Sequence, residues 1–297
     1  MKVIRSLVSA LFVAGILFTS TAMAEQPWLK PYTLTSNAKG TVAEQVKVTQ
    51  AALQGAGFEI AGTYQPYPSA AVISVTNDNL KGAAAKTEFG GYGAVIRVAL
   101  TQAGENVQVS YMNPEWMKAS FRMKGDLSAT SAALTKALGK GKIFGAEDPG
   151  WKADQLAEFH FTIFMPYFDD PFELVSHGSY EAAIKKVEAG LAAGKGGTAK
   201  IFRVDIPGKK QTLYGVALDK TSGSAGDQHI MSRIDNTDLK QTAHLPYGLL
   251  VSGNNVYALH AKFRIANSFP DLTMGTFFKI EDAPDAIEKA LATAAGG

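Results

Sequence analysis

The chain has 297 residues, of which 46% are hydrophobic, with 29 Lys and Arg, 27 Asp and Glu, and no Cys. The lack of Cys excludes disulfides, thiolate catalysis and Cys-ligated zinc, and a near-neutral chain without basic blocks argues against a nucleic-acid partner. This length and apolar content suffice for one large domain or two ordinary domains.

Residues 1–24 have the pattern of a secretory signal peptide. Lys2 and Arg5 precede an apolar run at 7–18, and the Ala-Met-Ala sequence at 22–24 is a small-x-small cleavage site. The run is too short to span a membrane. We therefore expect an exported, periplasmic protein that has no membrane span once the signal is removed. The remaining chain carries 27 basic and 27 acidic residues.

Residues 25–139 predict a first α+β unit. The sequence at 41–44 has the Thr-x-x-Glu form of a capping box, and the helix that it opens runs to about Leu53. A helix over about 127–138, ended by Gly139, completes the unit. Between the two helices lie four strand-like runs, at 58–65, 70–78, 92–100 and 106–112.

Residues 140–178 form an aromatic-rich connecting strap rather than a polar linker. The alternation of apolar residues from Phe159 to Met165 predicts a strand with one buried face. An exposed segment of this kind would be an aggregation risk, so we expect the strap to pack against one or both units.

Residues 179–297 repeat the order of the first unit. Ser179 is the expected N-cap of a helix, and Asp282 and Gly296 bound the last helix. An insertion at about 220–246 separates the second strand-like run of this unit from the third. The four runs lie at 198–206, 212–219, 247–252 and 256–266.

The two units indicate an internal duplication. The phrase MNPEWMKASF at 112–121 has an echo, SFPDLTMGTF, at 268–277. In each copy the Pro follows the Tyr that begins the third strand-like run by 22 or 23 residues. We therefore expect an α+β fold of two similar α-β-β-β-β-α units, each an antiparallel sheet with helices on one face. In this interpretation both phrases are strand-exit turns of the scaffold.

Short motifs connect the unit with a known family. A helix that runs into Gly57-Phe58 and a strand that runs into Asn113-Pro114 resemble domain of unknown function 302, a family of small bacterial α+β units. The resemblance covers about 42–125 and, less closely, 179–280, where neither dipeptide is kept. Because that family has no agreed activity, the resemblance implies a fold and no catalytic residues.

The insertion and the strand-like run after it carry candidate metal ligands, namely His229, Met231, His244 and His260. Imidazole and thioether groups together suit copper, and in a strand His229 and Met231 would share a face. The same residues also fit a polar loop with ordinary surface histidines.

Two arginines interrupt otherwise apolar runs, Arg97 in the first unit and Arg264 in the second. An inward-facing Arg needs a carboxylate partner or an anionic ligand, whereas an outward-facing one needs neither. Because the insertion and the strap are not part of the duplicated scaffold, we expect a ligand near them. The candidate ligand-binding residues are Arg233, Tyr247, Arg264, Phe161 and Tyr167.

Familiar enzyme motifs are absent, including Gly-x-Ser-x-Gly, His-Glu-x-x-His and the Walker loop. The sequence favours an exported, non-enzymatic binding or accessory protein with a small-molecule or protein partner in the periplasm. The alternatives are a periplasmic copper-binding protein and a hydrolase or isomerase of unfamiliar type that uses Asp or Glu with His.

Overall fold

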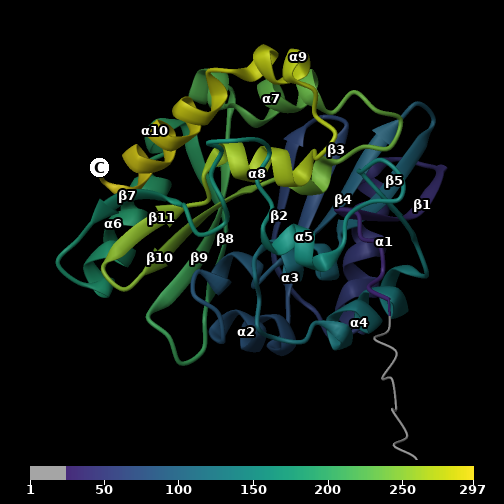
Figure 1. Cartoon of the computed structure of the whole chain (residues 1–297), viewed down its shortest axis with the longest axis horizontal. Coiled ribbons are helices and arrows are strands. Elements are labelled where there is room, and N and C mark those ends of the chain that lie inside the picture. Colours follow the sequence, from purple (N-terminus) through teal and green to yellow (C-terminus); the bar gives the residue numbers. More distant parts are fainter. Residues whose placement is uncertain (1–24) are drawn as a thin grey trace, which may run out of the picture.

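Two antiparallel sheets, with helices between and around them, form the architecture of this chain (Figure 1). The computed structural model describes residues 25–297, so the predicted signal peptide lies outside the described residues. The α+β fold class predicted from the sequence is confirmed. Among residues 25–297, no helix is both long and apolar enough to cross a membrane.

The first sheet has the strand order β2-β3-β4-β5-β1-β6. Its strands are β1 (Tyr32–Lys39), β2 (Glu59–Tyr67), β3 (Ala70–Thr76), β4 (Ile96–Ala103), β5 (Asn106–Met112) and β6 (Lys142–Phe144). Gly104 turns β4 into β5 at a φ of 61°, a conformation that glycine adopts readily. Every residue of β3 is buried, so both faces of this sheet are covered.

The second sheet has the strand order β7-β11-β10-β9-β8. Its strands are β7 (Phe172–Ser176), β8 (Thr198–Asp205), β9 (Gln211–Leu218), β10 (Tyr247–Ser252) and β11 (Asn255–Ala258). Taken from β1, the first sheet runs β1-β5-β4-β3-β2, so the chain visits corresponding places in the two sheets in the same order. We call residues 32–144 the first half and residues 172–295 the second half.

The four predicted helices begin and end close to the predicted bounds, whereas the helices at 78–85, 114–120, 153–157, 227–234, 261–268 and 274–277 were not predicted. Glu44 N and the Thr41 side chain are bonded at 3.3 Å at the start of the first helix, and Ser179 accepts from Ala182 N at 3.1 Å. The α-helices are α1 (Val42–Gly55), α2 (Asp78–Ala85), α3 (Pro114–Ser120), α4 (Ser128–Leu138), α5 (Ala153–Ala157), α6 (Tyr180–Ala192), α7 (Asp227–Ile234), α8 (Ala261–Ser268), α9 (Met274–Phe277) and α10 (Ala283–Ala295). The 3₁₀ turns are η1 (Gly90–Gly93), η2 (Lys195–Gly197), η3 (Lys220–Ala225), η4 (Thr242–His244) and η5 (Phe278–Ile280).

Each sheet is covered on one face by its own half and on the other by the opposite half. Helix α1 packs on the first sheet with α4 beside it, and α6 and α10 pack on the second sheet (Figure 1). The turn η1 of the first half contacts β9 and β10, while η4 of the second half contacts β3, β4 and β5. The predicted α-β-β-β-β-α order is incomplete, because β1 precedes α1 and β7 precedes α6. Helices α2 and α7 also lie between the second and third predicted strands of their halves.

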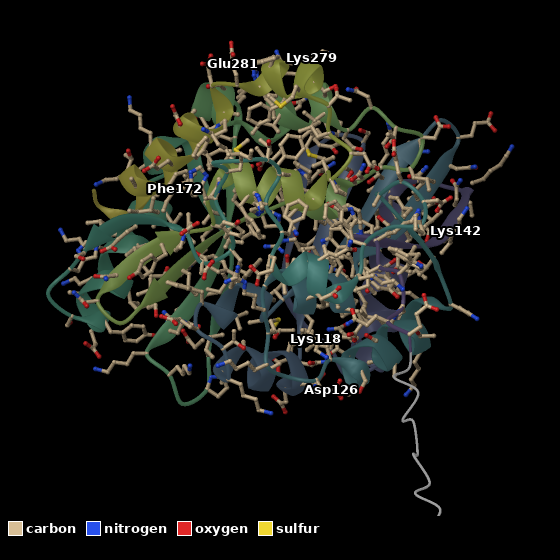
Figure 2. All side chains as sticks on the ribbon, in the orientation of Figure 1. Lys118, Asp126, Lys142, Phe172, Lys279 and Glu281 are labelled. Carbon is tan, nitrogen blue, oxygen red and sulfur yellow. The ribbon has the colours of Figure 1, made fainter. Side chains whose placement is uncertain are left out.

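The hydrophobic core consists of two clusters that each contain residues of both halves. One cluster joins Ile73 and Leu100 of the first half to Leu213 of the second. The other joins Tyr32 to Leu245. Each fully buried aliphatic side chain contributes about 1.5–3 kcal/mol, so separating the halves would expose a large share of the stabilising area. Figure 2 shows side chains filling the space between the layers, with Lys279 and Glu281 at the outer edge.

The strand predicted in the strap is wrong. Phe159 is buried, but Ile163 is 73% exposed and Phe164 fully exposed, so the alternating residues share no buried face. The strand in this part of the chain, β7, begins at Phe172 instead. Apolar alternation over a few residues predicts a strand only where a partner strand is available, and here none of the described strands pairs with the segment.

The strand predicted over 256–266 is also wrong. Strand β11 ends at Ala258 and α8 begins at Ala261. Residues 263–268 are all buried, and a helix buried on every side shows no amphipathic period. The phrase at 268–277 therefore follows a helix, whereas the phrase at 112–121 leads from β5 into α3. The interpretation of both as strand-exit turns holds only for the first.

Candidate functional site

Three of the predicted site residues, His244, Tyr247 and Arg264, meet in the interior. Arg264 Nη1 lies 3.0 Å from His244 Nε2, and Nη2 donates to the carbonyl oxygens of His244 and of Pro246, the latter at 2.7 Å. The guanidinium carbon lies 3.9 Å from the centre of the Tyr247 ring, a cation–π arrangement. Because a guanidinium only donates, Nε2 of His244 accepts and the neutral ring carries its proton on Nδ1.

Burial, and then the charges of Arg264 and Arg97, lower the pKa of His244 well below its usual value. The ring is therefore neutral at physiological pH. Its Nε2 is occupied by the guanidinium, which leaves no free lone pair at that nitrogen for a metal.

The other predicted residues lie elsewhere. Arg233 is on α7 and donates to the carbonyl of His229, four residues earlier, at 2.7 Å. Phe161 packs against the edge of a core cluster, and the ring of Tyr167 lies 4.6 Å from that of His160 in the strap. The predicted ligand-binding set is thus spread over the interior, α7 and the strap.

The candidate copper ligands are not brought together either. His229 and Met231 lie on α7 rather than on a strand, so side chains two residues apart point to different sides of the helix. His260 caps α8 by accepting from Lys262 N at 3.2 Å, and its ring stacks on Phe172 at 4.1 Å. Among residues 25–297, no group of three His, Cys, Asp or Glu side chains is placed to hold a metal ion.

The insertion at 220–246 forms η3, α7 and η4, and its polar side chains bond to the first half. Thr242 Oγ1 accepts from Thr101 Oγ1 at 2.9 Å and lies 3.1 Å from the Tyr67 hydroxyl. Gln108 donates to the Asp238 carbonyl at 2.7 Å and accepts from Lys240 N at 2.8 Å. These bonds hold the segment after α7 against the first sheet.

A pocket of about 530 Å³ lies beside this segment, and we call it the insertion pocket. It is bounded by residues 144–147 after β6, by 234–241 of the insertion, and by 269–276 after α8. Its floor is apolar and buried, and it consists of Phe144, Ile234, Phe269 and Leu272. This volume is in the range of small-molecule sites, which also combine an apolar lining with a few polar groups.

The rim of the insertion pocket carries acceptors. Gln241 is 7% exposed, and its Oε1 has no hydrogen-bond partner among the described residues. Burial raises the pKa of Asp271, although a hydrogen bond with the Glu147 backbone opposes the rise. Gly145 has a φ of 95°, and a Cβ there would lie 2.8 Å from the Tyr32 ring and 3.4 Å from Gln241 Oε1. Glycine at this position avoids a close contact with the Tyr32 ring.

A second pocket, of about 320 Å³, lies on the other side of the insertion segment, between α7 and the β2–β3 turn. Asp235 lines it, and burial raises the pKa of this carboxyl to about 6. Its Oδ1 accepts from Gln241 N at 3.0 Å, so one oxygen is already engaged. This pocket offers fewer unpartnered groups than the insertion pocket does.

Comparison of the chain with protein-family models, with curated proteins and with solved structures finds no match. The resemblance to domain of unknown function 302 accordingly stays a prediction.

The sequence pointed to the insertion but missed most of the residues that line its pocket. Residues 234–241 follow the predicted candidates closely, whereas Glu147 and Asp271 come from the strap and from the echoed phrase. The available signal was their acidic character on both sides of the insertion. Without the contacts between the halves, the acidic character of these residues does not show that they line one pocket.

Proposed function

We propose that the protein is an exported binding protein that holds a small organic cation, an amine with an apolar body, in the insertion pocket. The observation that carries this proposal is an apolar floor beside a rim whose described residues include three carboxylates and no Lys or Arg. The position of the pocket also supports the expectation of a ligand near the insertion.

Two of the side-chain donors on the rim are already used within the protein. Thr237 Oγ1 donates to the Leu239 carbonyl at 2.9 Å, and Asn236 Nδ2 donates to the Arg233 carbonyl at 2.6 Å. Among the described residues that line the pocket, none is Lys or Arg. The charged groups that line the pocket are the carboxylates of Glu147, Asp238 and Asp271.

An ammonium group donates only, so it is complementary to this rim. Its hydrogen bonds to these carboxylates would be charge-assisted, which makes them roughly twice as strong as neutral ones. The apolar body of the ligand would then cover the side chains of Phe269 and Leu272.

The test is a thermal-unfolding screen of the purified protein with an alkylammonium series and with the alkyl carboxylates of equal length, at constant ionic strength. Alkylammonium ions should raise the melting temperature with saturation, and the carboxylates should not. Asp271→Asn should weaken binding by about tenfold to a hundredfold, the loss expected for a hydrogen bond to a charged group. Asp285→Asn, an exposed acid on α10, is the matched control and should bind as the wild type does. Equal responses to ammonium and carboxylate would contradict the proposal.

We also propose that the two halves are copies of one unit. Their shared strand order and the reciprocal packing of η1 and η4 support this. The insertion at 220–246 is then an addition to the second copy, and the pocket owes one of its walls to that addition.

A further inference from the structure

A much smaller cavity, of about 20 Å³, lies between the two halves, away from the insertion pocket. Residues of both halves line it, and every one of them is buried. Among them are Arg97 of β4 and Arg264 of α8, with 3% and 6% of their surface exposed. Two arginines that are distant in sequence thus face one enclosed space.

The charges of these arginines are not compensated by an ion pair. Neither guanidinium has a carboxylate within 4.0 Å among residues 25–297. Burial, and then the charge of Arg264, lower the pKa of Arg97 to about 9, so the Arg97 side chain remains charged at neutral pH. The Arg264 guanidinium is charged as well, because arginine is not deprotonated in proteins. Burial raises the pKa of Asp227 to about 7 and that of Asp235 to about 6, which weakens the compensation that these acids can offer from a distance.

The cavity also contains donors without acceptors. Arg97 Nε has no hydrogen-bond partner among the described residues. Asn267 accepts from Trp116 Nε1 through its Oδ1 at 3.2 Å, which assigns its amide nitrogen as the free donor, and that nitrogen is also unpartnered. Buried polar groups almost always have partners, so several unpartnered donors around one space indicate a missing acceptor.

The space for this acceptor comes from a glycine. Gly248 of β10 pairs with Gly215 of β9, in the way that Arg97 of β4 pairs with Ser74 of β3. At corresponding places the first sheet supplies a guanidinium and the second sheet supplies no side chain. A Cβ at Gly248 would lie 3.4 Å from the ring of Tyr92, another residue that lines the cavity.

We propose that this cavity is a binding site for a monatomic anion, chloride, held between Arg97 and Arg264. A cavity of this volume has room for about one water-sized particle, which excludes oxyanions and organic acids on size. A single negative charge would compensate one of the two positive charges, lie between both guanidinium groups and accept from Asn267 Nδ2. The site differs from the insertion pocket in residues, in size and in the sign of the ligand, so either can fail without the other.

The first test is the stability of the purified protein in sodium chloride against sodium gluconate at equal ionic strength. Above the dissociation constant, each tenfold rise in chloride should raise the ratio of folded to unfolded protein about tenfold, with no such rise in gluconate. Arg97→Met should remove the chloride response. This variant should also be at least as stable as the wild type at low chloride, because it lacks the uncompensated charge. Arg233→Met, which changes an arginine on α7 away from the cavity, should keep the response.

The second test is a crystal structure of the wild-type protein grown in sodium bromide. An anomalous bromine peak between Arg97 and Arg264 would support the proposal, and it decides the question even if Arg97→Met fails to fold. A cavity that contains only water, without an anomalous peak, would overturn the proposal. Equal stabilities in chloride and gluconate would do the same.

Discussion

Asp227 should make the stability of the protein fall as the pH rises from 5 to 8. This carboxylate lies at the start of α7, is 1% exposed, and accepts from Leu218 N at 3.0 Å and from the Tyr64 hydroxyl of the first half. Its Oδ1 has no partner among the described residues. Burial is the largest influence and raises its pKa to about 7, although the hydrogen bonds from Tyr64 and Leu218 and the charge of Arg264 oppose the rise.

The sign follows from proton binding in the two states. The unfolded chain releases this proton near pH 3.9, whereas the folded protein keeps it until about pH 7. Between these values the folded state holds the extra proton, so its stability is greatest at low pH and decreases as the pH rises. For a folded pKa of about 7, the linkage relation gives a loss of about 3 kcal/mol between pH 5 and pH 8.

Two other buried groups titrate in the same window. Asp235 acts in the same direction as Asp227, because burial raises its pKa to about 6. His244 acts in the opposite direction, because a lowered pKa stabilises the protein above the unfolded value of about 6.5 and this contribution is lost as the pH falls. Both groups are present in Asp227→Asn, so the difference between wild type and variant isolates Asp227.

The assay is urea unfolding of wild type and Asp227→Asn at pH 5, 6, 7 and 8, with Asp285→Asn as the matched surface control. The wild type should lose about 3 kcal/mol relative to Asp227→Asn between the two ends of this range. Parallel pH profiles, within about 0.5 kcal/mol, would refute the raised pKa, because the common groups cancel in the difference.

Three further changes test the packing, the insertion and the metal hypothesis. Gly62→Ala should lower the free energy of unfolding by about 1–3 kcal/mol in urea, because its Cβ would lie 2.3 Å from the Ile201 carbonyl of β8. The control, Gly82→Ala on α2, has open space around the new Cβ and should be neutral or stabilising by up to about 1 kcal/mol. Gln108→Met should lower the free energy of unfolding by about 1–3 kcal/mol, because it removes both hydrogen bonds to the segment after α7. A stability in urea equal to that of the wild type would show that the segment is held without these bonds. Copper uptake, measured by elemental analysis, should be the same in Met231→Leu as in the wild type, because Met231 is only 2% exposed. A loss of copper in this variant would instead support Met231 as a metal ligand.

Local signals were enough to predict four of the ten α-helices described in residues 25–297. The capping box at 41–44 and the N-cap Ser179 begin helices where expected, and Gly139 and Gly296 follow the ends of α4 and α10. Such signals act within one or two turns of the chain, so they survive in the sequence whatever the tertiary context. Buried segments gave no comparable signal, and α8 was read as a strand because all its later residues are covered.

The convergence of side chains depends on how the halves dock, which no local pattern encodes. The sequence left open whether the side chains of Arg97 and Arg264 face inward or outward, and it gave no reason to expect the two side chains close together. They share a cavity because β4 of the first half and α8 of the second face each other across the packed core. The contact between η4 and the first sheet, which brings His244 into the same region, is likewise non-local.

The echoed phrase shows why likeness within a chain does not fix a role. In the first copy the phrase buries Trp116 and Met117 of α3 in the core, as a scaffold element should. In the second copy it follows α8, and its Asp271 and Thr273 line the insertion pocket. The same spacing of Pro, acid and hydroxyl therefore occurs in two structural settings, after a strand in the first copy and after a helix in the second. A pattern shared by two segments predicts a common role only where the elements before them also correspond.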